Sequence, residues 1–316
     1  MKAVRPRLVA AAVIACVPLA AHVRQAPQAP VFRAGVDLVT FGVTVTDRRG
    51  SFVGSLTAED FEIVEDGRPQ AIRYFSAGDS GEGRSGPEMH LGLVLDLSES
   101  MGEDLSFTKT ASVKFLNSLL EAVDITMVEF ETEVRVTRYS QDDYARLIER
   151  IRRQKTSGMT ALYDAIGVYL DGASGQKGRK IMLLYTDGGD TTSSMSFGDL
   201  VGVLKLSDAT VYVIGELEHQ SRFTKNEQRL RLQQIADLTG GKAFFPIDVK
   251  ELDRVYAQVL AEIRAQYTLG YLSTNDRTDG AWRKVDIRVK GAGGRCDCRV
   301  RARKGYFGPA GPPKQP

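Results

Sequence analysis

The sequence is poor in the residues that build zinc and thiol sites. Its 316 residues include three Cys, three His and one Trp. The histidines, His22, His90 and His219, are far apart, and no CxxC pair occurs. Zinc sites and His-based catalytic triads therefore have little support. Cys296 and Cys298 are two residues apart in a segment that alternates like a strand. A disulfide between them would be strained, so we expect two half-buried thiols.

The chain also lacks an excess of charge of one sign. It has 42 Lys and Arg against 40 Asp and Glu, a formal net charge of +2. Three of the basic residues, Lys2, Arg5 and Arg7, lie in the first seven positions, and without them the balance is slightly negative. A nucleic-acid-binding protein needs a clustered basic surface. We therefore expect no nucleic-acid partner.

Long apolar runs are absent beyond the first twenty residues. Residues 1–21 have a basic start, an apolar run over 8–17 and small residues at Ala20 and Ala21, which is typical of a secretory signal peptide. The run is too short for a comfortable transmembrane span. We expect a mature chain without a transmembrane segment that is secreted, periplasmic or on the cell surface. An uncleaved anchor, or a lipid on Cys16, is the alternative.

Composition and periodicity divide the remaining chain into segments. Residues 88–265 alternate apolar strands with amphipathic helices, which predicts a doubly wound, mostly parallel sheet. The two-residue link Glu131-Thr132 predicts a hairpin, and so one antiparallel edge strand. The other segments are a linker at 22–31, strands within 32–78, a Gly/Ser linker at 79–87, strands within 266–307 and a disordered tail at 308–316.

The two β segments are each too small to fold alone. We therefore expect them to pair into one β-sandwich, with the α/β domain inserted between them. The alternative is two separate β appendages packed on the α/β domain. Within the first segment, 61–65 and 71–76 read as two strands joined by a turn at Glu65-Asp66-Gly67.

Polar side chains that could bind a ligand follow one predicted buried strand. The apolar run that starts at Leu91 ends in Asp96, Ser98 and Ser100. In open α/β sheets, ligands bind in the crevice beyond the carboxyl ends of the strands. A carboxylate and two hydroxyls are hard oxygen ligands, which suit Mg²⁺ far better than Zn²⁺. The alternative is that Ser98 or Ser100 caps the following helix.

Two more residues join this set if the two most apolar strands are neighbours. The strand 181–185 is followed by Asp187, and Thr160 lies in a loop just before a helix. Two carboxylates acting through water would leave Mg²⁺ electrophilic, because the ion keeps several waters. A carboxylate from another molecule could then complete its coordination.

These three parts resemble a metal-ion-dependent adhesion site, the signature of von Willebrand factor type A domains. They are Asp-Leu-Ser-Glu-Ser from Asp96, the Gly-Met-Thr-Ala that contains Thr160, and Tyr-Thr-Asp-Gly at Asp187. The resemblance covers about residues 88–265. It implies direct metal bonds from Ser98, Ser100 and, in the ligand-bound form, Thr160, with Asp96 and Asp187 acting through water. The chain as a whole is similar to a bacterial group of exported von Willebrand factor A-related proteins.

The expected function is metal-dependent binding of a protein ligand, or adhesion, without catalysis. The cofactor is Mg²⁺ or another hard divalent cation, Ca²⁺ or Mn²⁺, and the unknown protein ligand supplies a carboxylate. Glu99 and Met101 are candidate contacts for that ligand, and the alternative for Met101 is a place in the core. A Mg²⁺-dependent hydrolase is one alternative, although Ser98 stands where such enzymes usually carry a second carboxylate. A structural scaffold with an empty site is the other.

Two further acidic residues lie close to this set in the sequence. Asp164 follows Thr160 on the next helix, and we expect it to fix the loop by hydrogen bonds. Asp190 reads as a turn residue.

Overall fold

The computed structural model describes residues 38–78, 87–119, 121–290 and 297–311. The expected signal peptide and first linker lie outside these residues, as do most of the 79–87 linker and the last five residues of the chain. All of the described residues belong to one compact unit.

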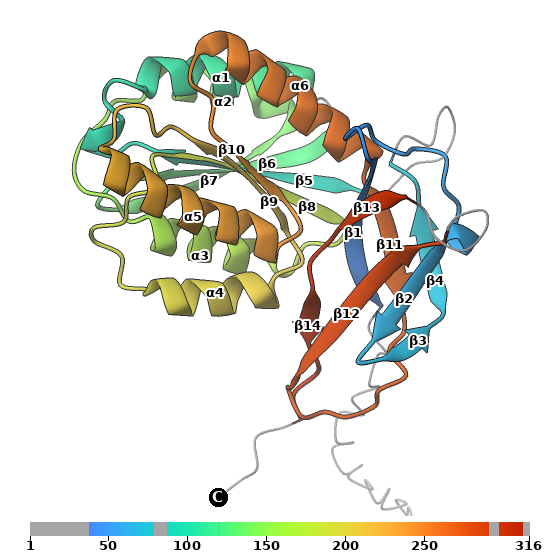
Figure 1. The fold of residues 1–316 in the computed structure, drawn as a ribbon. Helices are drawn as coiled ribbons and strands as arrows, with labels where there is room; N and C mark the ends of the chain where they lie inside the picture. Colours follow the sequence, from blue (N-terminus) through green and yellow to red (C-terminus); the bar gives the residue numbers. More distant parts are fainter. Residues whose placement is uncertain (1–37, 79–86, 120, 291–296, 312–316) are drawn as a thin grey trace, which may run out of the picture. The chain divides into compact units, whose positions relative to one another are not determined.

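A six-stranded sheet forms the centre of the α/β part, in the order β10-β9-β8-β5-β6-β7 (Figure 1). Neighbouring strands are parallel except β6 and β7, which form the expected antiparallel hairpin, with a link of three residues (131–133) rather than two. β5 and β8 are adjacent, with Leu95 opposite Tyr185, so the two most apolar strands are neighbours as expected. The strands are β5 (Met89–Asp96), β6 (Ala122–Phe130), β7 (Val134–Ser140), β8 (Arg179–Thr186), β9 (Thr210–Gly215) and β10 (Lys242–Phe244).

Helices cover both faces of this sheet (Figure 1). Alternate residues of β5 point to opposite layers: Leu93 packs with α1 and α6, whereas Val94 packs with α3, α4 and α5. Because both faces are covered, the strand is apolar throughout rather than alternating. The helices are α1 (Leu105–Ser118), α2 (Tyr144–Arg153), α3 (Leu162–Ala173), α4 (Phe197–Leu206), α5 (Arg222–Leu238) and α6 (Val249–Ala265), with 3₁₀ turns η1 (Ala58–Asp60), η2 (Glu99–Met101) and η3 (Gln141–Asp143).

The remaining strands form a β-sandwich built from both ends of the chain. One sheet has the order β13-β1-β11-β4 and the other β14-β12-β2-β3, so each combines strands from before and after the α/β part. The single sandwich expected from the sequence is confirmed, and the two separate appendages are not found. The strands are β1 (Val39–Asp47), β2 (Phe61–Glu65), β3 (Arg68–Gln70), β4 (Ile72–Ser76), β11 (Tyr267–Tyr271), β12 (Trp282–Val289), β13 (Cys298–Arg301) and β14 (Gly305–Phe307).

The pairing expected between 61–65 and 71–76 is wrong. β2 pairs instead with the three-residue β3, with Glu65 opposite Arg68. The turn residues Asp66 and Gly67 have φ of 45° and 82°, which gives a two-residue hairpin loop and so fixes this register. β4 then joins the other sheet, where it pairs with β11.

The expectation of free thiols is also wrong at one position. Cys298 is disulfide-bonded. The other two cysteines of the chain, Cys16 and Cys296, lie outside the described residues. A structural disulfide suits an oxidising compartment better than the cytosol.

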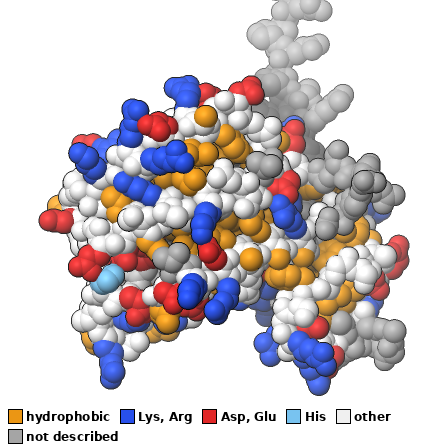
Figure 2. Space-filling view, turned by 90° about the horizontal axis from the view of Figure 1, so that it is seen from above, with side chains coloured by type: hydrophobic (Ala, Val, Ile, Leu, Met, Phe, Trp, Pro, Cys, Tyr) orange, Lys and Arg blue, Asp and Glu red, His pale blue; other side chains and the backbone are white. Residues whose placement is uncertain are grey.

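Two features of the described residues bear on charge and on membranes. Figure 2 shows one face of the protein, on which acidic and basic side chains are interspersed. No helix within the described residues has the length and the apolar character that crossing a membrane requires.

Candidate functional site

Asp96 is the last residue of β5, at the carboxyl end of the sheet, and its side chain is fully buried. Its Oδ1 accepts hydrogen bonds from the backbone N–H of Ser98 at 3.0 Å and from the Ser98 hydroxyl at 2.5 Å. The Ser98 and Ser100 hydroxyl oxygens are 3.1 Å apart. The structure therefore brings the first three residues of the expected set into direct contact.

Asp187 follows β8, the strand beside β5, and is also buried. The hydroxyl of Thr186 donates to Oδ2 of Asp96 at 2.6 Å and so joins the two strand ends. Asp187 accepts from the backbone N–H of Gly189 at Oδ1 and from the Gln220 amide at Oδ2, both at 2.9 Å. The amide group must donate through Nε2, since an ionised carboxylate only accepts. Both oxygens of Asp187 are thereby held in place.

The electrostatics of this pair are unfavourable for two negative charges. Burial, and then the nearby charge of Asp187, raise the pKa of Asp96 to about 7, although hydrogen bonds from Ser98 and Thr186 oppose the shift. No Lys, Arg or His among the described residues forms an ion pair with either carboxylate. Buried charges are normally paired, bound to a metal or neutralised by a proton, and the described residues supply no cationic side chain to this pair.

Thr160 lies in the loop between α2 and α3, beside the loops that follow both strands. The Gly158 carbonyl accepts from the Glu99 backbone N–H at 3.1 Å, and the Thr160 carbonyl accepts from the Thr191 backbone N–H at 2.8 Å. These contacts tie the segment to both strand ends. No hydrogen bond among the described residues joins the Thr160 hydroxyl to the other four residues of the set. The structure thus brings the Thr160 segment to the site through backbone hydrogen bonds.

The two candidate partner contacts differ in exposure. Glu99 is exposed at the start of η2, beside the exposed Ser100. Met101 is completely buried in the same turn and belongs to the apolar core. Of the two alternatives for Met101, a ligand contact or a core residue, the structure favours the core, because the 3₁₀ turn points its side chain inward.

The acidic neighbours hold the loops around the site. The Asp164 carboxylate accepts from the backbone N–H groups of Ser194 at 2.8 Å and Met195 at 2.9 Å, so it fixes a loop as expected. Asp190 accepts from the Ser193 hydroxyl at 2.6 Å and the Tyr163 backbone N–H at 3.2 Å. Each of these carboxylates contacts a loop rather than the five-residue set.

Sequence reasoning missed three residues around the site: Thr186, Gln220 and Glu216. Glu216, just after β9, is buried and accepts from the Thr108 hydroxyl of α1 at 2.9 Å. Burial raises its pKa well above the ordinary value, and Asp104 is the largest of the acidic neighbours that add to the shift. Thr186 could have been noticed as a polar residue ending an apolar strand. Gln220 and Glu216 carry no local signal, because their partners are 33 and 108 residues away.

The donor set fits a hard divalent cation rather than zinc. Within the described residues, no three His, Cys, Asp or Glu side chains are arranged to hold a metal ion. A site here must therefore use hydroxyls beside the two carboxylates, and Ser98, Ser100 and Thr160 provide them. Carboxylate, hydroxyl and water oxygens are the ligands of Mg²⁺, Ca²⁺ and Mn²⁺.

Several solved structures resemble the chain. A von Willebrand factor type A protein from Catenulispora acidiphila is 15% identical, with a TM-score of 0.47, over 87% of this chain and 75% of that one. The vWF domain of the type V pili tip protein Mfa5 from Porphyromonas gingivalis is 12% identical, with a TM-score of 0.46, over 62% and 100%. The PilB minor pilin from Streptococcus sanguinis is 14% identical, with a TM-score of 0.47, over 59% and 63%, so the chain spans less than two thirds of that pilin.

A search of curated proteins found no match. The sequence profile of the von Willebrand factor type A domain matches residues 90–258, more than half of the chain and nearly all of its α/β part. The chain therefore belongs to the von Willebrand factor type A domain family.

Proposed function

We propose that this is an exported, non-enzymatic protein that binds a protein partner through a divalent cation at Asp96, Ser98, Ser100, Thr160 and Asp187. The observation that carries the proposal is the buried pair Asp96 and Asp187, which has no cationic partner among the described residues. Like charges buried together destabilise the fold unless a cation neutralises them.

The five residues of the proposed site have two different roles. Ser98, Ser100 and Thr160 would hold the cation by neutral hydroxyls, and Asp96 and Asp187 would act through water. The exposed Ser100 lies on the solvent side and the buried Asp96 on the inner side. Hydroxyl ligands leave most of the positive charge uncompensated. A bound cation would supply an electrophilic centre for a partner's carboxylate, so partner binding depends on it.

The two serines provide the direct test of this site. Isothermal titration of MgCl₂ should give saturable binding to the chelator-treated wild type. The double variant Ser98→Ala/Ser100→Ala should bind at least about tenfold more weakly, since it loses two of the ligands. The matched control is Ser106→Ala/Ser118→Ala, which removes two hydroxyls on α1 away from the site.

Failure at each step has a distinct meaning. Equal affinity in the two double variants would remove the metal site from the proposal. Mg²⁺-dependent hydrolysis of a generic phosphoester, lost in Ser98→Ala/Ser100→Ala, would replace binding by catalysis. If a chelator does not change the capture of the partner, the remaining interpretation is a structural scaffold with an empty metal site.

A further inference from the structure

Two exposed apolar side chains lie beside the candidate metal site. Met159 immediately precedes Thr160 and is 52% exposed. Phe223 lies in the first turn of α5, three residues after Gln220, and is 81% exposed. Single exposed apolar residues are common on protein surfaces and need no explanation. These two differ from the others because each lies within a few residues of a group that forms or orients the site.

The chain itself limits how far Phe223 lies from the site. The Gln220 amide is 2.9 Å from Oδ2 of Asp187. Three residues of chain reach at most about 11 Å, which bounds the distance between the Cα atoms of Gln220 and Phe223. Side chains of a helix tilt toward its amino end, and the amino end of α5 is the end at the site. The Phe223 ring therefore lies within reach of a ligand bound there.

Met159 and Phe223 lie on opposite sides of the site. The site is formed at the ends of β5 and β8, the two central strands in the order β10-β9-β8-β5-β6-β7. The Met159 backbone N–H donates to the Thr132 hydroxyl at 3.0 Å, and Thr132 belongs to the link between β6 and β7. Phe223 instead belongs to α5, which packs against β9 and β10. One apolar side chain therefore lies on the β6 side of the site and the other on the β9 side.

The exposed charges of the neighbouring loops favour a partner surface of neither sign. Glu99 and Arg222 are exposed, have opposite charges and form no ion pair with any described residue. The other exposed charges there are paired: Glu218 with Lys225, and Glu103 with His219. A cation at the site would attract a carboxylate, but the surrounding charges would not distinguish one acidic residue from another. The apolar side chains are the features that could.

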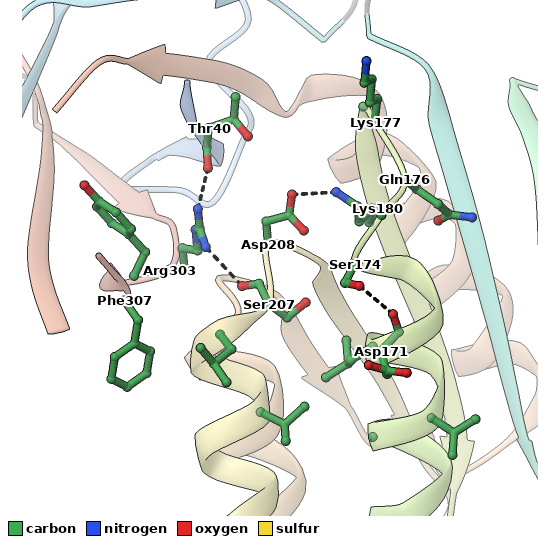
Figure 3. Close-up of a pocket in the computed structure, with 18 of the residues that line it drawn as sticks. Thr40, Asp171, Ser174, Gln176, Lys177, Lys180, Ser207, Asp208, Arg303 and Phe307 are labelled. Carbon is green, nitrogen blue, oxygen red and sulfur yellow. Dashed lines mark hydrogen bonds and ion pairs between the residues drawn. The ribbon is translucent and has the colours of Figure 1, made fainter. Parts of the chain in front are cut away.

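A large cavity elsewhere on the molecule is not part of this surface. It measures about 1550 Å³ and lies between α3 and α4 of the α/β part and β1 and β14 of the sandwich (Figure 3). Three basic and three acidic side chains line it, so its charge favours a ligand of neither sign. The cavity includes Lys180, the second residue of β8, whereas Thr186 at the site is the last. Six residues of strand span roughly 20 Å, so a residue bound at the site does not reach it.

We propose that Met159 and Phe223 select the partner of the metal site, a protein segment in which one aspartate or glutamate is flanked by apolar side chains. The inference rests on the proposed cation-dependent binding. The carboxylate meets the cation, and its apolar neighbours pack on Met159 on one side and on Phe223 on the other. An aromatic ring buries a large apolar area, and a methionine side chain adapts its shape. The pair therefore accepts several apolar neighbours and disfavours Gly, Ser or charged ones.

The test is a selection of peptides by the full mature chain. A phage library X-X-X-Asp-X-X-X, with every residue type at X, is captured in excess MgCl₂ and released with EDTA. A library with Asn in place of Asp is selected in parallel and should be retained far less. Apolar residues next to the Asp should be enriched over the input library. In fluorescence anisotropy, a selected peptide should bind at least about tenfold more tightly than its version with Gly on both sides of the Asp.

Matched variants locate the preference. Met159→Ser/Phe223→Ser should bind the selected peptide at least about tenfold more weakly and should no longer enrich apolar neighbours. It should still prefer the Asp library to the Asn library, and isothermal titration should give the Mg²⁺ affinity of the wild type, because the five residues of the metal site are unchanged. Leu206→Ser/Leu230→Ser is the control, since it removes two apolar helix residues, 66% and 67% exposed, and should behave like the wild type.

The outcomes separate this inference from the proposed function. Normal Mg²⁺ binding without enrichment of apolar neighbours would overturn the inference alone, as would an equal loss in the two double variants or unchanged selection by Met159→Ser/Phe223→Ser. Weaker Mg²⁺ binding by that variant would also overturn it, since the two residues would then support the metal site itself. No Mg²⁺ binding by the wild type, equal retention of the Asp and Asn libraries, or the same selection with EDTA present throughout would overturn both proposals.

Discussion

Gln220 is the residue on which the position of Asp187 depends. Its amide donates to Oδ2 of Asp187, a buried atom for which the described residues offer no other donor. Gln228 approaches the same loop from α5 without such a bond: its Oε1 is buried and has no partner among the described residues. Two glutamines therefore lie against one loop, and only one of them orients a carboxylate.

We expect Gln220→Leu to destabilise the metal-free protein by about 1–3 kcal/mol, the cost of an unsatisfied buried acceptor. It should also weaken Mg²⁺ binding, since Asp187 loses its orientation. Urea denaturation and isothermal titration measure the two effects. Gln228→Leu is the control: it removes an acceptor that is already unsatisfied, so it should neither lower the stability nor weaken Mg²⁺ binding. Equal stability of the two variants would show that Asp187 does not need Gln220.

Asp96 makes the stability of the metal-free protein depend on pH. Its pKa is about 7 in the folded state and about 3.9 in an unfolded chain. Between these values the folded state holds the proton more tightly than the unfolded state. The contribution of Asp96 to the free energy of unfolding is therefore fully present below about pH 4 and is lost as the pH rises through 7. Each unit of the pKa difference corresponds to about 1.4 kcal/mol. Glu216, whose pKa is also raised, acts in the same direction.

We therefore expect Asp96→Asn to raise the melting temperature more at pH 7.5 than at pH 5 in EDTA, because the amide removes the charge that burial opposes. Differential scanning calorimetry of both proteins at the two pH values provides the measurement. Excess Mg²⁺ should stabilise the wild type at pH 7.5 and have much less effect on Asp96→Asn. A melting-temperature difference that is the same at both pH values would contradict the assignment.

At the scale of elements, strand identity was more predictable than side-chain contacts. The fully apolar runs that end at Asp96 and Asp187 predict buried parallel strands, and two such strands bring their carboxyl ends together. The hairpin β6–β7 was predictable because the link between its strands is too short for a crossover connection. The pairing of β2 was not predictable from periodicity, because the Asp66-Gly67 turn selects β3 over β4.

The site was predictable where its residues follow strands and unpredictable where a contact crosses the fold. The burial of Met101 depends on the direction of a short 3₁₀ turn. Contacts such as Thr108 with Glu216 depend on how α1 packs against the end of β9. Neither depends on a local pattern in the sequence, so each needed the structure.

The contact between α1 and β9 leads to a prediction of its own. Thr108→Val should destabilise the protein by about 1–3 kcal/mol, because the buried Glu216 loses the hydroxyl that donates to both of its oxygens. Thr110→Val, on the same helix, is the control, since its exposed hydroxyl bonds only the Ser106 carbonyl. A double-mutant cycle with Glu216→Gln should give a coupling energy above about 0.5 kcal/mol. Additive effects would mean that the two elements are not coupled through this bond.

At the scale of the whole molecule, one buried carboxylate joins the two ends of the chain. Glu65 of β2 accepts from the Tyr271 hydroxyl at 2.7 Å and the Tyr306 hydroxyl at 2.8 Å. The Ser273 hydroxyl donates to its other oxygen at 2.6 Å. The tyrosines belong to β11 and β14, which lie in different sheets of the sandwich. The first strands therefore depend on the last ones, although Glu65 lies 206 and 241 residues from the two tyrosines in the sequence.

This dependence predicts how a nicked protein behaves. A protease site inserted after Glu82 and cut in the folded protein should leave two fragments that co-elute on gel filtration, because β1, β2 and β4 stay paired with strands of the other fragment. Glu65→Leu should make the fragments separate at a lower urea concentration, since two buried tyrosine hydroxyls and the Ser273 hydroxyl lose their acceptor and the buried Arg283 loses its carboxylate. Glu62→Leu changes the outward face of the same strand and should leave that concentration nearly unchanged. Fragments that separate without urea would mean that the linker, rather than the sandwich, holds the two ends together.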